Sequence, residues 1–294
     1  MRRYLKLLLF LIFILMLIKG NTSFNAAFIA LNLWYEKLIP SLFPIMVVVK
    51  VLHQYHILEY LCYPFNNLLK SIFHINANAF IYVLSSIILG FPTSSLLIGT
   101  NDYLTKNQKK RLIYTCSFAS PPFIIITCGS QMYHSSVVGY KLFFISLCSG
   151  LLLLFFTRNT SINITKKIET TQPFAILLSD AILSSIKTLF MIGGYLMLVM
   201  SIQAVLTPYL PPILTFPLNM TIEFASGSAF LSNQVITSNY KYILQSGLLG
   251  FGGFCVHLQV LSMNQNCHLS YRSYFKYRMA QAFISLVIAY FIFR

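Results

Sequence analysis

One acidic residue, Glu223, stands inside an apolar stretch of the chain, where Met220, Ile222 and Phe224 flank it. The chain has only six acidic residues, and the other five fall in predicted loops or near the ends of predicted helices. A carboxylate in an apolar segment is costly to bury, and its default interpretation is functional: it binds a polar solute or carries a proton. The alternative is a structural hydrogen bond to a neighbouring segment.

Small, hydroxyl-bearing and helix-breaking residues interrupt apolar sequence at residues 90–95 and 223–228. Proline lacks a backbone donor and glycine permits a tight turn, so both segments predict broken helices. A broken helix frees backbone amides and carbonyls, which can bind a ligand where protein or water surrounds them. The positive N-terminal ends of half-helices suit anionic groups. The alternative is that the small residues only let helices pack closely.

We therefore predict one substrate-binding site where the two interruptions meet. Ser120 belongs to a further stretch of small residues at 117–122, and Gln259 is a polar group in the middle of an apolar segment. The nearby His257 is more typical of a buried core histidine than of a ligand. The predicted substrate-binding residues are Pro92, Thr93, Ser94, Ser95, Ser120, Glu223, Ser226, Gly227 and Gln259.

The two interruptions occur at matching places in the two halves of the chain. Phe91 and Phe118 are 27 residues apart, and so are Phe224 and Phe251, which places the halves at an offset of 133 residues. Paired interruptions in corresponding positions of two halves are the best sequence pointer to the binding site of a membrane transporter.

The composition is that of a membrane protein. The chain is 57% hydrophobic and 9% charged, whereas soluble domains have about 25% charged residues. Its net charge of +15 comes from short clusters of lysine and arginine between apolar segments, as expected when positive loops orient a chain in the bilayer. This placement argues against nucleic acid as a partner.

The apolar segments predict an all-α polytopic membrane protein with seven transmembrane helices and two re-entrant hairpins. Each predicted span approximates the ~20 apolar residues that cross a bilayer. An amphipathic helix at 55–75 is expected at the membrane interface. The hairpins are expected at 78–104 and 210–236. The predicted spans are 4–19, 33–52, 111–131, 136–157, 181–206, 241–263 and 274–293.

The distribution of positive charges favours hairpins over simple crossings in these two segments. If Arg2, Arg3 and Lys6 are cytoplasmic, the cluster 106–111 also stays inside only when 78–104 turns back. A second hairpin likewise keeps the basic residues 272–278 inside. This topology makes 33–157 and 181–293 inverted repeats, places the N-terminus in the cytoplasm and places the C-terminus outside.

The corresponding domain organisation has four parts. An extra N-terminal helix spans 1–19, the first repeat with the interfacial helix spans 20–157, a cytoplasmic linker spans 158–180, and the second repeat spans 181–294. Signatures of hydrolases, nucleotide-binding enzymes and zinc proteases are absent, so we expect neither an enzyme nor a cofactor. The six cysteines show no pairing with histidine that would predict a metal site.

Three segments together resemble a known family. They are LWYEKLIPSLFP at 33–44, GFP at 90–92 and GFGGFCVHLQV at 250–260. On these motifs the chain resembles the sporulation integral membrane proteins of the YlbJ type, and the resemblance covers about residues 30–290. That family belongs to the wider nucleoside recognition or gate-domain group, which is related to concentrative nucleoside transporters.

The resemblance implies an endospore-forming bacterium, a place in its cell membrane and a role in making the spore, its cortex in particular. Combined with the paired interruptions, it predicts a transporter or permease-like factor for a small polar solute. The alternative is a non-transporting membrane scaffold for assembly of the spore envelope. Besides the solute and the lipid bilayer, the sequence leaves two further partners open: a second copy of the chain and other sporulation membrane proteins.

The predicted orientation can be tested by labelling. In a variant without native cysteines, we expect Asn107→Cys to resist an impermeant thiol reagent added to intact cells, because the positive cluster around it stays in the cytoplasm. Permeabilised cells provide the control and should be labelled. Rapid labelling of intact cells would contradict the first hairpin and the inverted repeat with it.

Overall fold

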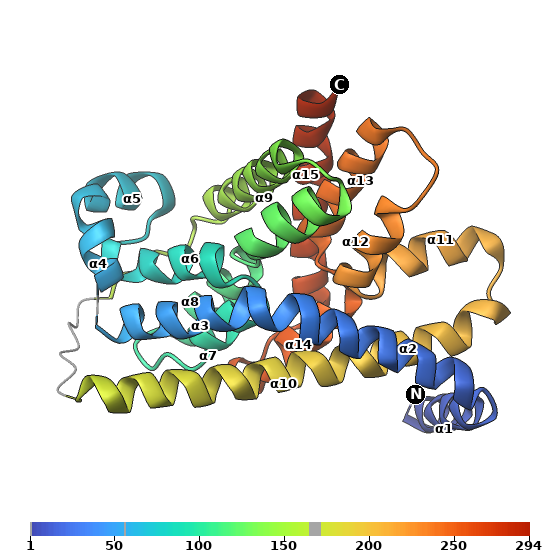
Figure 1. Cartoon of the computed structure of the whole chain (residues 1–294). Helices are drawn as coiled ribbons and strands as arrows, with labels where there is room; N and C mark the ends of the chain where they lie inside the picture. The colour runs from blue at the N-terminus through green and yellow to red at the C-terminus, as the bar shows by residue number, and fades with distance from the viewer. Residues whose placement is uncertain (1, 56, 165–171) are drawn as a thin grey trace.

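The computed structural model describes residues 2–55, 57–164 and 172–294 (Figure 1). Their regular secondary structure is helical, apart from a single β-bridge between Ile75 and Ile162. The all-α fold class is therefore confirmed for the described part of the chain.

Four helical segments are long and apolar enough to cross a membrane, as far as the described residues reach. The first helix, α1 (Arg2–Ile18), adds a fifth candidate together with the following helix, from which it is bent by 94°. These segments make the chain a multi-pass membrane protein, and the total of seven spans stays a prediction. The four are α9 (Ser136–Phe156), α10 (Phe174–Leu206) with its short extension to Tyr209, α13–α14 (Ser238–Met263) and α15 (Tyr271–Phe293).

The N-terminal third contains more helix than the sequence predicted. Residues between the expected spans 4–19 and 33–52 form α2 (Gly20–Leu33), which continues through a π-helical turn (Trp34–Leu38) into α3 (Ile39–Gln54). The wide turn precedes Pro40, which has no N–H to donate to the preceding turn. The α2–α3 helix runs alongside α10, and the Trp34 indole donates a hydrogen bond to the carbonyl of Leu189 (2.9 Å; Figure 1).

The segment expected as one interfacial helix is divided. It consists of α4 (Ile57–Cys62), a 3₁₀ turn (Tyr63–Phe65) and α5 (Asn66–Phe73), and the division falls at Pro64. These short helices stand at one end of the molecule, away from α13 and α15 (Figure 1).

The segments around the predicted interruptions form pairs of short helices. None of α6, α7, α11 and α12 has the ~20 residues that cross a bilayer. Two of the expected spans are also interrupted: 111–131 at residues 116–120, and 241–263 at Gly252. The helices are α6 (Ala77–Leu89), α7 (Thr93–Gly99), α8 (Lys106–Thr115), a π-helical segment (Phe123–Met132), α11 (Pro212–Thr221), α12 (Phe224–Ser232), α13 (Ser238–Phe251) and α14 (Gly253–Met263).

The expected linker 158–180 is shorter than predicted. Its last residues belong to α10, which begins at Phe174, and its residues 165–171 lie outside the described part of the chain. The apolar run therefore starts seven residues earlier than the predicted span at 181, because Asp180 lies on an exposed face of α10 and does not end the helix.

The packing of α2–α3 against α10 depends on a glycine beneath Trp34. A Cβ added at Gly193 would lie 2.7 Å from the indole ring, whereas one added at the adjacent Gly194 would meet nothing within 4 Å. We expect Gly193→Val to lower the free energy of unfolding by about 1–3 kcal/mol through overpacking. Gly194→Val is the matched control, because it carries the same helix-propensity cost. Equal melting temperatures of the two purified variants in detergent would contradict this packing.

Candidate functional site

Four of the nine predicted site residues line one small cavity of about 30 Å³. They are Pro92 from the break between α6 and α7, Ser120 from the break after α8, Glu223 from the break between α11 and α12, and Gln259 from α14. The structure thus brings both predicted interruptions to the same place. Apolar side chains complete the wall: Leu38, Leu42, Phe91, Phe123, Ile192, Leu196, Phe224 and Val256.

The two breaks touch each other through aromatic rings. The ring centroids of Phe91 and Phe224 are 5.0 Å apart in an edge-to-face arrangement, and Phe123 lies 4.6 Å from Phe224. Phe91 and Phe224 are the residues matched by the 133-residue offset. Such pairs contribute about 0.5–1.5 kcal/mol beyond their burial.

Each break is also joined by its backbone to the next broken helix of the same half. In the first half the Phe91 amide donates to the carbonyl of Phe118 (2.7 Å), and in the second the Cys255 amide donates to the carbonyl of Ile222 (2.8 Å). These bonds satisfy backbone groups that the breaks release, which is a strict requirement inside a membrane.

A glycine in each half permits this close approach. A Cβ at Gly90 would lie 2.5 Å from the backbone nitrogen of Ser120, and one at Gly253 would lie 2.9 Å from that of Phe224. Both glycines have positive φ (70° and 76°), a conformation that costs L-residues strain. The breaks therefore need glycine for both backbone conformation and space.

Glu223 is buried, with 3% of its surface exposed, and it caps the N-terminus of α12. Its Oε2 accepts a hydrogen bond from the backbone N–H of Ser226 (2.6 Å), and its backbone carbonyl accepts from the N–H of Gly227 (2.8 Å). The positive end of α12 stabilises the carboxylate. The structural hydrogen bond left open by the sequence thus exists, but it runs to the following helix of the same segment.

Gln259 and Ser120 supply the other polar groups of the cavity. The Gln259 side-chain amide donates only to the sulfur of Cys255 (3.4 Å), as far as the described residues show. Gln259 is 3% exposed and Ser120 is 5% exposed, so both are buried. Sulfur is a weak acceptor, so this amide keeps capacity for a stronger partner.

The hydroxyl residues of α7 are buried but do not line the cavity. Ser95 donates to the carbonyl of Pro92 (2.6 Å) and accepts from the amide of Asn264 (3.0 Å), which ties α7 to the end of α14. The Thr93 hydroxyl faces the sulfur of Met46 (3.8 Å), and Ser94 is 2% exposed. For Thr93 and Ser95 the observed contacts are those of packing and helix ends.

Gly227 and Ser226 also lie outside the cavity. A Cβ at Gly227 would lie 2.0 Å from the carbonyl oxygen of Met220, so this residue lets α11 and α12 pack closely. Ser226 lines a separate groove of about 380 Å³ between α2, α10, α11 and α12, together with Gln203 and Asn219. Because the Ser226 amide holds the Glu223 carboxylate, this cap lies between groove and cavity.

The sequence did not reveal the role of Arg278. The positive-inside rule grouped it with the basic residues of the cytoplasmic face, and the structure shows that its side chain is completely buried. Its guanidinium donates to the carbonyls of Tyr114 (2.6 Å), Ser117 (2.7 Å) and Gly250 (3.5 Å). It thus caps the C-terminal ends of two broken helices, α8 and α13. One sequence signal was present: Tyr274, Arg278, Gln281 and Ser285 share one face of α15.

Gln245 is a second buried polar residue that sequence reasoning missed. Its side chain donates to the Ser228 hydroxyl (2.8 Å) and accepts from the Tyr133 hydroxyl (3.0 Å), which connects α13 to α12 and to the end of the π-helical segment.

His257 lies among aromatic rings with its Nε2 at 2.9 Å from the carbonyl of Phe251, as expected for a core histidine. Within the described residues, no three histidine, cysteine or acidic side chains gather as a metal site.

The helices and their sequestered polar groups define a multi-pass membrane protein with a buried polar centre at the meeting point of its helix breaks. The chain is similar to the "Sporulation integral membrane protein YlbJ" of Bacillus subtilis (strain 168), with 22% identity over 312 aligned positions. The alignment covers 91% of this chain and 76% of that protein. The resemblance to the YlbJ type is thereby confirmed. No protein-family model matches the chain, and no solved structure matches it.

The capping role of Arg278 gives a test of the site's framework. We expect Arg278→Met to lower the free energy of unfolding by about 3 kcal/mol, because buried carbonyls lose a charged donor. Arg272→Met removes an exposed arginine of the same helix and should leave stability nearly unchanged. Melting temperatures in detergent measure both. An equal effect of the two substitutions would contradict the cap.

Proposed function

We propose that this protein is a sporulation-associated transporter or permease-like factor whose substrate, a small polar solute, binds between Glu223 and Gln259. The observation that carries the proposal is the buried carboxylate in the cavity where the two helix breaks meet. Ionisable groups inside membrane proteins mark solute and ion pathways. The similarity to YlbJ, a sporulation membrane protein by its name, supports the biological setting.

The chemistry of the cavity points to a class of solute. A carboxylate is an acceptor of hydrogen bonds when ionised, and a side-chain amide is both donor and acceptor. A solute with hydroxyl or ammonium groups complements Glu223, and one with a carbonyl or ring nitrogen complements the Gln259 amide. Nucleosides carry groups of both kinds, in keeping with the group that the sequence resembles.

The proposed topology has seven spans, with α6–α7 and α11–α12 as re-entrant hairpins of two inverted repeats. Each pair consists of half-length helices that meet near the cavity, which supports this arrangement. Each half has a close glycine contact and a backbone hydrogen bond between its break and the next broken helix, which supports a common structure of the two halves. The N-terminus is then cytoplasmic and the C-terminus outside.

The cavity is too small for a solute in this conformation. A volume of about 30 Å³ accommodates a water molecule, whereas solute pockets occupy roughly 300–1,000 Å³. Transport therefore requires the breaks to separate. The groove beside Ser226 has a suitable size of about 380 Å³, and it is separated from the cavity by the Glu223 cap. We infer that solute enters from this groove when the cap opens.

A scaffold for spore-envelope assembly is the second candidate. The small size of the cavity and the packing of Phe91, Phe123 and Phe224 in its wall favour it, since a scaffold needs a rigid core and no solute pathway. The two functions differ in ligand binding. A ligand that binds the folded protein raises its melting temperature, and a scaffold has no such small ligand.

The test replaces Glu223 by glutamine in an endospore-forming host. Glutamine keeps the size and can still accept the bond from Ser226, so we expect a folded, inserted protein that no longer supports sporulation. Glu36→Gln is the control, because it removes an exposed carboxylate outside the cavity. Spore counts and membrane levels of each variant are the measurements. Normal spore counts from Glu223→Gln would contradict the proposal.

Solute binding is tested on the purified protein. A panel of nucleosides, sugars and amino acids is screened for an increase in melting temperature in detergent. We expect an increase with at least one class, and its loss in Glu223→Gln but not in Glu36→Gln. Loss of sporulation in Glu223→Gln without stabilisation by any solute would favour the scaffold.

A further inference from the structure

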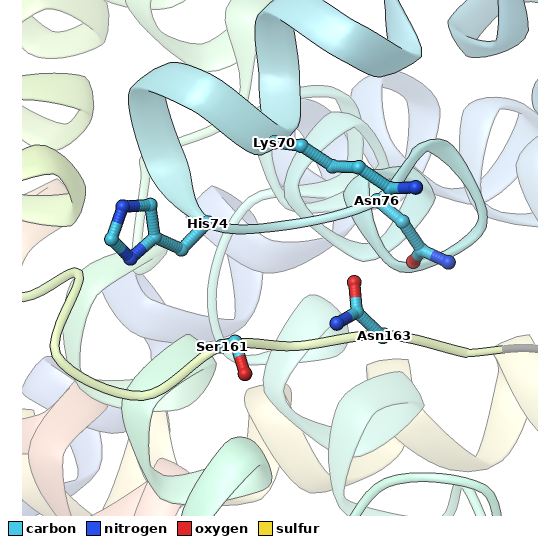
Figure 2. A pocket seen from close by; sticks show the side chains of 5 residues that line it. All are labelled: Lys70, His74, Asn76, Ser161 and Asn163. Atoms are coloured by element: carbon cyan, nitrogen blue, oxygen red, sulfur yellow. The ribbon is translucent and has the colours of Figure 1, made fainter.

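A polar pocket separate from the Glu223 cavity lies at the end of the molecule that carries α4 and α5. Its volume is about 440 Å³, and it is lined by Lys70, His74, Asn76, Ser161 and Asn163. Figure 2 shows Lys70 extending toward Asn76, with the Asn163 amide pointing into the same space from the opposite segment. None of the five lining residues is acidic.

The walls of this pocket are fixed by backbone bonds. The Asn76 amide donates to the carbonyl of Ile162 (3.1 Å), and the Ile162 amide donates to the carbonyl of His74 (2.9 Å). The Asn76 side chain donates to the carbonyl of Ile164 (2.8 Å) and accepts from its amide (3.2 Å). These bonds hold the backbones of the two segments together, and they fix the Asn76 side chain between them.

A buried arginine, Arg111, donates hydrogen bonds to the backbones of both segments that form the pocket. The Arg111 guanidinium donates to the carbonyl of Phe73 (2.7 Å), next to His74, and to the carbonyl of Thr160, next to Ser161. Arg111 belongs to the basic cluster at the start of α8. The pocket consequently lies in a region of positive charge, which attracts anions.

Four of the lining side chains have hydrogen-bonding capacity to spare. Lys70, His74, Ser161 and Asn163 form no side-chain hydrogen bond with any residue that the structure describes, and all four are exposed. An ammonium, a ring N–H, a hydroxyl and an amide can all donate to one group with several oxygens. A phosphate group fits this set of donors.

The surroundings favour a phosphate that belongs to a lipid. The adjoining α4–α5 region exposes large apolar side chains: Tyr60 at 74%, Leu61 at 62%, Phe65 at 57% and Leu68 at 55%. A short amphipathic region of this kind lies in the membrane interface with its apolar side among acyl chains. The neighbouring pocket then lies at the level of the lipid headgroups.

We propose that this pocket binds the phosphate group of an anionic phospholipid headgroup. Free phosphate shares the chemistry, but it would make no use of the apolar surface beside the pocket. The proposal is independent of whether the protein transports a solute, because the two sites share no lining residue.

Lipid binding to the delipidated protein in detergent tests this site. Native mass spectrometry and melting temperature are measured with phosphatidylglycerol, with phosphatidylcholine and with inorganic phosphate. We expect preferential binding of phosphatidylglycerol and stabilisation by it. In Lys70→Gln/His74→Gln the affinity for phosphatidylglycerol should fall at least about fivefold, the effect of roughly one interfacial basic residue. Asn163→Asp, which places a negative charge in the pocket at constant size, should weaken binding as well.

Lys276→Gln is the matched control, because it removes an exposed lysine of another helix. All four altered positions are exposed, so the melting temperatures without lipid should remain close to the native value. Unchanged phosphatidylglycerol binding in the pocket variants, or an equal loss in Lys276→Gln, would overturn the proposal. Binding of inorganic phosphate without preference for phosphatidylglycerol would overturn the lipid assignment.

Discussion

The structure depends on satisfying the backbone groups that its helix breaks release. Arg278 does this for two breaks at once, since its buried guanidinium binds carbonyls at the ends of α8 and α13. In a hydrocarbon environment, such carbonyls have no water to replace a lost partner. A buried arginine is itself costly, and its three carbonyl partners compensate for its desolvation. The cavity beside Glu223 exists because these broken helices are held together in one arrangement.

Close contact between the breaks requires small residues as well as hydrogen bonds. Gly90 lies against Ser120 and Gly253 lies against Phe224, so in each half a glycine lets a break approach the next broken helix closely. The polar residues do not repeat in this way: Glu223 corresponds to Gly90, and Gly253 to Ser120. The halves thus share a framework but contribute different chemistry to the cavity.

The positions of the breaks could be predicted from sequence because glycine and proline act locally. Pro92, Ser120, Glu223 and Gln259, which the sequence grouped, line one cavity. The sequence could not show that Thr93 and Ser95 lie outside this cavity. Tertiary packing decides which side of a half-helix faces a cavity. The burial of Arg278 could not be predicted, because the positive-inside rule counts charges without regard to burial. The helix α2 was missed because Asn21, Thr22 and Ser23 resemble a loop in composition.

The central claim is that the breaks of the two halves meet at one cavity, and a double-mutant cycle on Phe91 and Phe224 tests it most directly. The free energies of unfolding of Phe91→Ala, Phe224→Ala and the double variant are compared, with Phe91 and Phe216 as a control pair, because Phe216 packs on Phe230. We predict a coupling of about 0.5–1.5 kcal/mol for the first pair and near-additivity for the second. Additive effects of Phe91→Ala and Phe224→Ala would contradict the meeting of the two breaks.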